Sequence, residues 1–282
     1  MPMQPAASPQ WRQLSAGPFQ LHVYHATEQS FGVTSTIVEA AHGLVLIDAQ
    51  FTLPDAAQLV ARIQALDKPL QAVYISHGDP DYYFGLQAIR AAFPTATVYA
   101  SAPTVAHIAH TAQPKLDFWG PKLGANGTTN AVLPQVLKGH ALELDGHALE
   151  IIGLDGADAE HSFVWLPDAH AAIGGVSVFS GLHLWMADAG SPERRATWLA
   201  KLAQLTALNP TVVVPGHVKD VQVLDASPVA YTQQYLRAYE AALADAPTSA
   251  QLIERLRAQY PAVGMALGLE MGAKVTTGES KW

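Results

Sequence analysis

The segment "YISHGDPDYYFG" at residues 74–85 concentrates side chains that can bind a metal ion or transfer protons. An apolar run ends at His77, and Asp79 and Asp81 follow it at alternate positions. Imidazole and carboxylate groups bind Zn²⁺, Mn²⁺ or Fe²⁺ and also act as general acids and bases. Asp is common in turns, so a structural turn is the alternative for either aspartate alone. The three residues together favour a metal or catalytic site.

More candidate ligands stand where strands are expected to end. Asp158 and His161 follow the strand expected at 147–155, and His217 ends the apolar strand expected at 210–217. Strand ends at one edge of a sheet bring distant parts of the chain together. We therefore expect these side chains to converge with those of residues 77–81.

Other side chains have two interpretations each. His183 in "GLHLWMAD" (181–188) is a candidate acid or base, or a histidine packed beside Trp185. Tyr82 is a candidate proton donor or oxyanion contact, or a core residue with a satisfied hydroxyl. Asp48 ends an expected strand and is predicted to support the site or the fold rather than to react.

The order of the expected elements predicts an α/β (α+β) fold, a four-layer αβ/βα sandwich formed by one domain over residues 1–282. Apolar and β-branched runs predict strands, and apolar spacing of three and four residues predicts helices. The expected strands are 19–26, 32–40, 43–49, 71–76, 96–101, 147–155, 161–167, 170–179 and 210–217. The expected helices are 54–66, 82–93, 102–112, 191–208, 226–245 and 248–258.

Three segments are expected to lie outside this regular pattern. Residues 1–18 are predicted to be an N-terminal extension, and the C-terminal part, 226–282, is predicted to be helices followed by an irregular tail from 268. Residues 113–130 are rich in Gly, Pro, Asn and Thr, which predicts a lid loop or a plain surface excursion. As a lid, it would offer Lys115, Phe118 and Trp119 to a small acidic or aromatic-bearing substrate.

Composition excludes several classes of function. The 16 Lys and Arg residues are scattered in a chain of net charge −8, which argues against a nucleic-acid partner. There is no cysteine, so disulfides, thiolate metal sites and a Cys nucleophile are excluded. The start "MPMQPAASPQW" lacks the features of a secretory signal, and no apolar stretch reaches transmembrane length. We expect a cytoplasmic protein that acts on a small molecule and does not bind membranes, with a periplasmic location and a homodimer left open.

Several motifs resemble the metallo-β-lactamase superfamily. "SHGDPDYYFG" is similar to that superfamily's T-H-x-H-x-D-H-x-x-G signature after a strand, and "VVVPGH" (212–217) to its late Pro-Gly-His motif. "SFVWLPDAHAAIGGVSVF" (162–179) resembles its later strand pair, and "GLVLIDAQ" (43–50) its early strand with an Asp. The resemblance extends over roughly residues 20–220 and implies the fold named above.

The resemblance also implies a metal site with replaced ligands. The positions that correspond to ligands in the family are, in chain order, His77, Asp79, Asp81, Tyr82, Asp158, Gly175 and His217. The family's first metal then implies a pocket of His77, Asp79 and Asp158, with His217 as a further ligand. Tyr82 is a poor ligand and Gly175 has no side chain, so the second metal site is incomplete.

These correspondences imply a hydrolase with one divalent ion, for which we expect Zn²⁺, with Mn²⁺ or Fe²⁺ as alternatives. Its substrate would be an ester, lactone, thioester or amide, attacked by a metal-activated water with Asp81 as general base. A rearranged site that uses His161 or His183 is one alternative. The other is a metal-free or non-catalytic binding protein that keeps the fold.

Overall fold

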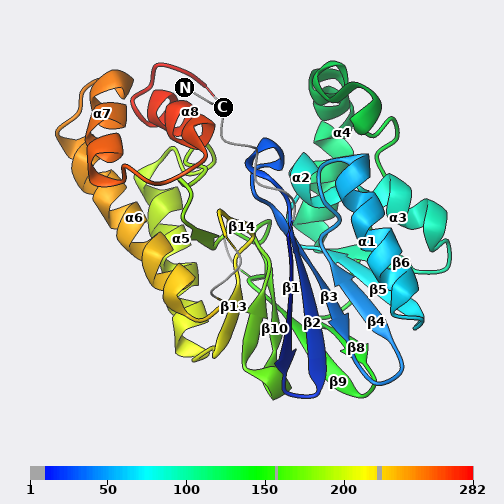
Figure 1. Cartoon of the computed structure of the whole chain (residues 1–282). Helices are drawn as coiled ribbons and strands as arrows, with labels where there is room; N and C mark the ends of the chain where they lie inside the picture. The colour runs from blue at the N-terminus through cyan, green and yellow to red at the C-terminus, as the bar shows by residue number, and fades with distance from the viewer. Residues whose placement is uncertain (1–9, 156–157, 221–223, 282) are drawn as a thin grey trace, which may run out of the picture.

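Two β-sheets pack face to face between two layers of helices in the computed structural model, which describes residues 10–155, 158–220 and 224–281 (Figure 1). The larger sheet has the strand order β1-β2-β3-β4-β5-β6-β7, antiparallel from β1 to β4 and parallel from β4 to β7. Its strands are β1 (Gln10–Ala16), β2 (Phe19–His25), β3 (Thr34–Glu39), β4 (Leu44–Ile47), β5 (Leu70–Ile75), β6 (Thr97–Ala100) and β7 (Gln135–Val136).

The second sheet has the order β13-β11-β10-β9-β8, and a short parallel pair, β12 with β14, lies beside it. Its strands are β8 (Ala141–Leu144), β9 (His147–Ile152), β10 (Phe163–Leu166), β11 (Ala171–Ile173) and β13 (Val212–Val214). The separate pair consists of β12 (Phe179–Ser180) and β14 (His217–Val218). His217 is thus held by a strand pair at the edge of the second half.

Helices cover the outer face of each sheet, which confirms the four-layer αβ/βα sandwich (Figure 1). On one side lie α1 (Leu53–Ala65), α2 (Pro80–Tyr83), α3 (Leu86–Ala92) and α4 (Ala102–Leu123). On the other lie α5 (Pro192–Ala207), α6 (Ser227–Ala244), α7 (Ser249–Gln259) and α8 (Ala266–Thr276). Single 3₁₀ turns occur at η1 (Glu28–Ser30), η2 (Gly124–Asn126) and η3 (Pro167–Ala169).

Strand β4 shows why the central strands are apolar at every position. Val45 and Ile47 belong to the cluster between the two sheets, whereas Leu44 and Leu46 belong to the cluster under the helices. In a strand that is buried on both faces, side chains at odd and at even positions both lie in an apolar environment. Its sequence is therefore apolar throughout instead of alternating between apolar and polar residues. Burial on both faces fixes the strand, and with it the residues that follow its C-terminal end.

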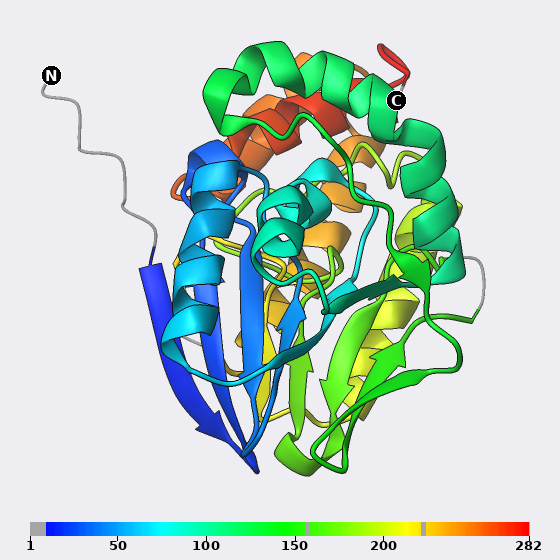
Figure 2. The ribbon, with the colours of Figure 1, turned by 90° about the vertical axis from the view of Figure 1, so that its right-hand side faces the viewer.

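The prediction of an irregular loop at 113–130 is wrong for residues 113–123, because α4 continues through Leu123. Leu116, Trp119 and Leu123 recur at helical spacing and pack against the core, which outweighs the cost of two prolines inside the helix. Figure 2 shows α4 bending as it passes over the end of the sandwich, the effect expected of Pro114.

Two expectations for the chain ends are also corrected. Residues 10–16 of the supposed N-terminal extension form β1, which pairs with β2 along its whole length, while residues 1–9 lie outside the described part. The supposedly irregular tail contains α8, because Leu269 and Ala273 recur at helical spacing and are fully buried. No helix within the described residues combines the length and apolarity needed to span a bilayer.

Candidate functional site

Strand β5 ends at Ile75, and the turn after it is fixed by Asp48. Asp48 Oδ1 accepts a hydrogen bond from the Ser76 backbone N–H, and Oδ2 accepts one from Ser76 Oγ, both at 2.8 Å. Asp48 is fully buried, and burial raises its pKa to about 7. It therefore orients the residue that precedes His77, which agrees with the supporting role expected for it.

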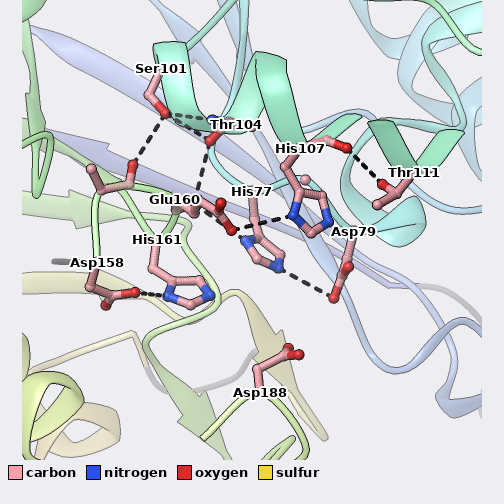
Figure 3. A network of polar contacts seen from close by, with 12 residues as sticks. His77, Asp79, Ser101, Thr104, His107, Thr111, Asp158, Glu160, His161 and Asp188 are labelled. Atoms are coloured by element: carbon pink, nitrogen blue, oxygen red, sulfur yellow. Dashed lines mark hydrogen bonds and ion pairs between the residues drawn. The ribbon is translucent and has the colours of Figure 1, made fainter. Parts of the chain in front are cut away.

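His77, Asp79 and Asp188 form a cluster whose potential ligand atoms all lie within 4.8 Å of one another (Figure 3). His77 Nε2 is 3.3 Å from Asp79 Oδ2, and His77 Nδ1 is 3.3 Å from the backbone carbonyl of Glu160. With Nδ1–H directed at that carbonyl, Nε2 faces the two carboxylates and is the atom that would bind a cation after losing its proton. Nε2 is buried, and its 3.3 Å contact with Asp79 is an ion pair that lacks good hydrogen-bond geometry. A buried imidazole nitrogen facing two carboxylates is suited to bind a divalent cation.

The charges of this cluster are strongly coupled. Burial lowers the pKa of His77, but the carboxylates of Asp79, Asp188 and Asp81 outweigh burial and raise it to about 9. Burial alone would raise the pKa of Asp79, but the charges of His77 and Lys115 hold it well below its usual range. A divalent ion would take the place of the His77 proton between the same carboxylates.

Lys115 fixes the orientation of Asp79. Its Nζ donates to Asp79 Oδ1 at 2.9 Å and to the carbonyl of Gly78 at 3.0 Å, and it lies 3.0 Å from His107 Nε2. Asp79 occupies the N-cap position of α2, yet its side chain caps no backbone N–H. Its Oδ2 is therefore left to face His77. The structure gives Lys115, expected as a lid residue that meets substrate, an ion pair with a candidate ligand.

Asp158 lies beside this cluster and outside it. Its carboxylate pairs with His161 Nδ1 (Figure 3). It also pairs with Lys201 Nζ at 3.0 Å. The imidazole of His161 lies against that of His77, with ring centroids 4.8 Å apart. Asp188 thus takes the position at the cluster for which sequence reasoning nominated Asp158.

Asp188 is the last residue of "GLHLWMAD" (181–188), a segment in which the sequence indicated His183 and not Asp188 as a candidate functional residue. A carboxylate five residues after a candidate histidine was the available signal. The loop that carries Asp188 to His77 follows from tertiary packing, which no local pattern encodes.

Asp81 and His217 form a second pair next to the cluster. His217 Nδ1–H donates to the carbonyl of Phe31 at 3.0 Å, and His217 Nε2 is 3.5 Å from Asp81 Oδ2. Burial raises the pKa of Asp81 to about 7, with the charge of Asp79 adding to it, and burial lowers the pKa of His217 to about 4. Two groups at this separation are able to exchange a proton.

Tyr82 fills the space between the two parts of the site. Its ring meets His77 and His217 edge-on, each with centroids 5.5 Å apart. Its hydroxyl is buried, without a hydrogen-bond partner among the described residues, and the ring lines neither of the cavities described below. The ring packs between the two histidines, whereas the hydroxyl lacks the partner expected of a core tyrosine, so the role of Tyr82 stays a prediction.

His183 lies away from the cluster. Its Nδ1 is 2.6 Å from Tyr235 Oη of α6, and it lines neither cavity. Its hydrogen bond is therefore to α6 rather than to a member of the His77, Asp79 and Asp188 cluster.

We expect the free energy of unfolding to fall as the pH is lowered, because the buried His183 must take up a proton. Burial and the charge of Arg257, partly opposed by Glu28, lower its folded-state pKa to about 4, below the 6.5 of an unperturbed His. The unfolded chain then binds more protons, so stability falls as pH drops through 6.5 toward 4, by about 2–3 kcal/mol for this group. Urea unfolding in the presence of a chelator should show a smaller loss in His183→Asn, whose amide oxygen can still accept from Tyr235. Equal losses in parent and variant would contradict this assignment.

Two cavities open onto the site. The larger, about 630 Å³, is lined by three histidines and five acidic residues, including His77, Asp79 and Asp188. The smaller, about 340 Å³, is largely aromatic and reaches Asp79, Asp81 and His217. Asp79 lines both cavities, so a ligand in either would meet the cluster.

The sequence profile described as the Metallo-beta-lactamase superfamily matches residues 30–217, which include the β5 turn, Asp188 and His217. The chain belongs to this superfamily. The comparison with curated protein sequences gives no match.

Solved metallo-beta-lactamases share the fold. The enzyme from Pontibacter korlensis is 21% identical with a TM-score of 0.56, and the alignment covers 81% of this chain and 99% of that one. DIM-1 exposed to ceftazidime is 18% identical with a TM-score of 0.58, covering 83% and 99%. FIM-1 from Pseudomonas aeruginosa, solved in a mono-zinc form, is 17% identical with a TM-score of 0.57, covering 83% and 97%.

Proposed function

We propose that this superfamily member is a metal-dependent hydrolase with one divalent ion bound by His77, Asp79 and Asp188. The observation that carries the proposal is the buried His77 Nε2 facing the carboxylates of Asp79 and Asp188 beside the point where the two cavities meet. One imidazole and two carboxylates suit Zn²⁺ and also Mn²⁺ or Fe²⁺. The substrate class is an ester, lactone, thioester or amide.

The residues around the cluster support a single ion. The superfamily's second ion would need ligands at the positions of Tyr82 and Gly175. Gly175 has φ +82°, and a Cβ there would lie 2.5 Å from the Ser162 carbonyl oxygen, so an aspartate does not fit without a backbone shift. Asp81 and His217 are left as a pair with no further ligand at those two positions.

The chain's own groups have separable roles in hydrolysis. A bound divalent ion would polarise the substrate carbonyl and lower the pKa of an attacking water. Lys115 keeps Asp79 ionised and turned toward His77. Asp81, which lines the smaller cavity and faces His217, is placed to accept a proton from the water and to return it to the leaving group.

A metal-free binding protein is the second candidate, and one observation favours it. Lys115 pairs with Asp79 and Lys201 pairs with Asp158, so two of the nearby carboxylates are already compensated without an ion. The two candidates differ in whether the purified protein holds a metal ion at all, and the proposed ligand set adds that this ion depends on Asp188.

Elemental analysis of untagged protein, dialysed against Zn²⁺ or Mn²⁺ and then against buffer, separates the two candidates. We expect about one equivalent of metal in the parent and in Asp158→Asn, and little in Asp188→Asn. Loss in Asp158→Asn with retention in Asp188→Asn would return Asp158 to the ligand set. Absence of metal from every sample would contradict the hydrolase proposal and favour the binding protein.

A further inference from the structure

The smaller cavity is a preformed aromatic chamber. Phe31 and Phe51 line it together with Phe118 and Trp119 of α4. Trp119 meets Phe51 edge-on with ring centroids 5.1 Å apart, and it meets Phe31 at 5.7 Å. Rings that pack on one another in this way keep their orientation when the chamber is empty, so little ordering is required on binding.

The chamber also joins the two halves of the sandwich. Met265, which precedes α8, lines it opposite the α4 residues. Figure 1 shows α4 and α8 on the two sides of the same end of the fold. The volume of about 340 Å³ lies at the lower end of the usual range for small-molecule sites. An aromatic ring or a branched apolar group is a fitting occupant.

The larger cavity also has apolar walls, including Trp185 and Trp198, but it carries more polar groups than the aromatic chamber. Ser177 and Thr197 offer hydroxyls, Glu160 and Glu193 offer carboxylates, and Arg194 offers a guanidinium. Both signs of charge are present, so hydrogen-bonding groups are favoured there over a large apolar group.

Lys115 is a poor anchor for an anionic substrate, although it lines the aromatic chamber. Its ammonium is already engaged by Asp79 and the Gly78 carbonyl. Asp79 and Asp81 line the same chamber and add negative charge. A free carboxylate on the apolar group would therefore be disfavoured, which argues against the small acidic substrate considered from the sequence.

We infer that the substrate has an uncharged aromatic or branched apolar group on one side of its scissile carbonyl and a hydrophilic group on the other. The two cavities share Asp79, Val176 and Trp185, so a carbonyl at the candidate metal would direct its two substituents into the two chambers. The orientation of the substrate in this inference rests on the proposed hydrolase function. The existence of the aromatic subsite does not depend on that function.

Two glycerol monoesters test the inference, glyceryl phenylacetate and glyceryl acetate, with acid release followed by pH-stat. Burying the phenyl ring should raise kcat/KM by about tenfold or more over the acetyl ester. Trp119→Ala should bring the ratio of the two values toward one. Trp11→Ala is the matched control, because Trp11 lies on edge strand β1 against Tyr24, away from both cavities, and should leave the ratio unchanged.

Binding of 2-naphthylacetamide, measured by calorimetry, separates failure of the inference from failure of the proposed function. If neither ester is hydrolysed, binding with a negative heat-capacity change that Trp119→Ala abolishes would support the subsite without the hydrolase. Absence of binding would overturn the subsite. Hydrolysis with a preference for the acetyl ester would overturn the inference and leave the proposed hydrolase function intact. The same holds if Trp119→Ala keeps the preference for the phenylacetyl ester.

Discussion

Replacing His77 by alanine is expected to weaken metal binding more than 100-fold, since losing even an outer-shell partner of a metal ligand costs about 10–100-fold. His77 supplies the single nitrogen of the proposed ligand set, and its Nε2 has no other partner among the described residues. Hydrolysis should fall to the background rate in the same variant, because the carbonyl and the water lose the ion that activates them.

Metal affinity is measured by competition with a chromophoric chelator, and stability by thermal unfolding with and without that chelator. An ion present at about 100 times its Kd stabilises the folded state by about 2.7 kcal/mol. Chelation should therefore lower the Tm of the parent by several degrees and leave that of His77→Ala unchanged. His147→Ala is the control, because His147 pairs with Asp168 on an exposed face away from the cluster, and it should respond like the parent. If the chelator leaves the Tm of the parent unchanged, the proposed metal site is contradicted.

Replacing Asp48 by alanine is expected to lower stability by about 3 kcal/mol, because the Ser76 N–H and hydroxyl both lose their buried acceptor. The same change should weaken metal binding about 10–100-fold, since Ser76 leads directly into His77. Asp48 has φ +61°, a backbone conformation that Asn tolerates better than Ala. Asp48→Asn keeps one acceptor for the Ser76 N–H and should recover most of both losses.

Asp55→Ala separates the effect on metal from the effect on folding. Asp55 accepts hydrogen bonds from Tyr24, Ser30 and Thr52, so its loss should also destabilise the fold. It lies at the start of α1, outside both cavities, and should leave metal affinity unchanged. Equal losses of metal affinity in Asp48→Ala and Asp55→Ala would show that Asp48 acts only through global stability.

The sequence by itself determined the layer architecture and pointed to the strand ends that carry the candidate site. Continuous apolar runs such as β4 require burial on both faces, and that requires helices outside each sheet. The turn after β5 and the end of the last strand were recognisable, since His77 and His217 each follow an apolar strand with turn-forming residues around them. Local pattern suffices where a residue is positioned by its own strand.

Tertiary structure alone decided the partners of those residues. Asp188 lies in a loop that reaches His77, whereas Asp158 pairs with Lys201. Matching positions to a family motif by their order in the chain cannot distinguish these two outcomes. The conversion of the expected lid into the end of α4 has the same origin. Pro114 and Gly120 locally disfavour a helix, but the packing of Leu116, Trp119 and Leu123 on the core outweighs them. Burial energy depends on what the rest of the chain places opposite each side chain, and that information is absent from any short stretch of sequence.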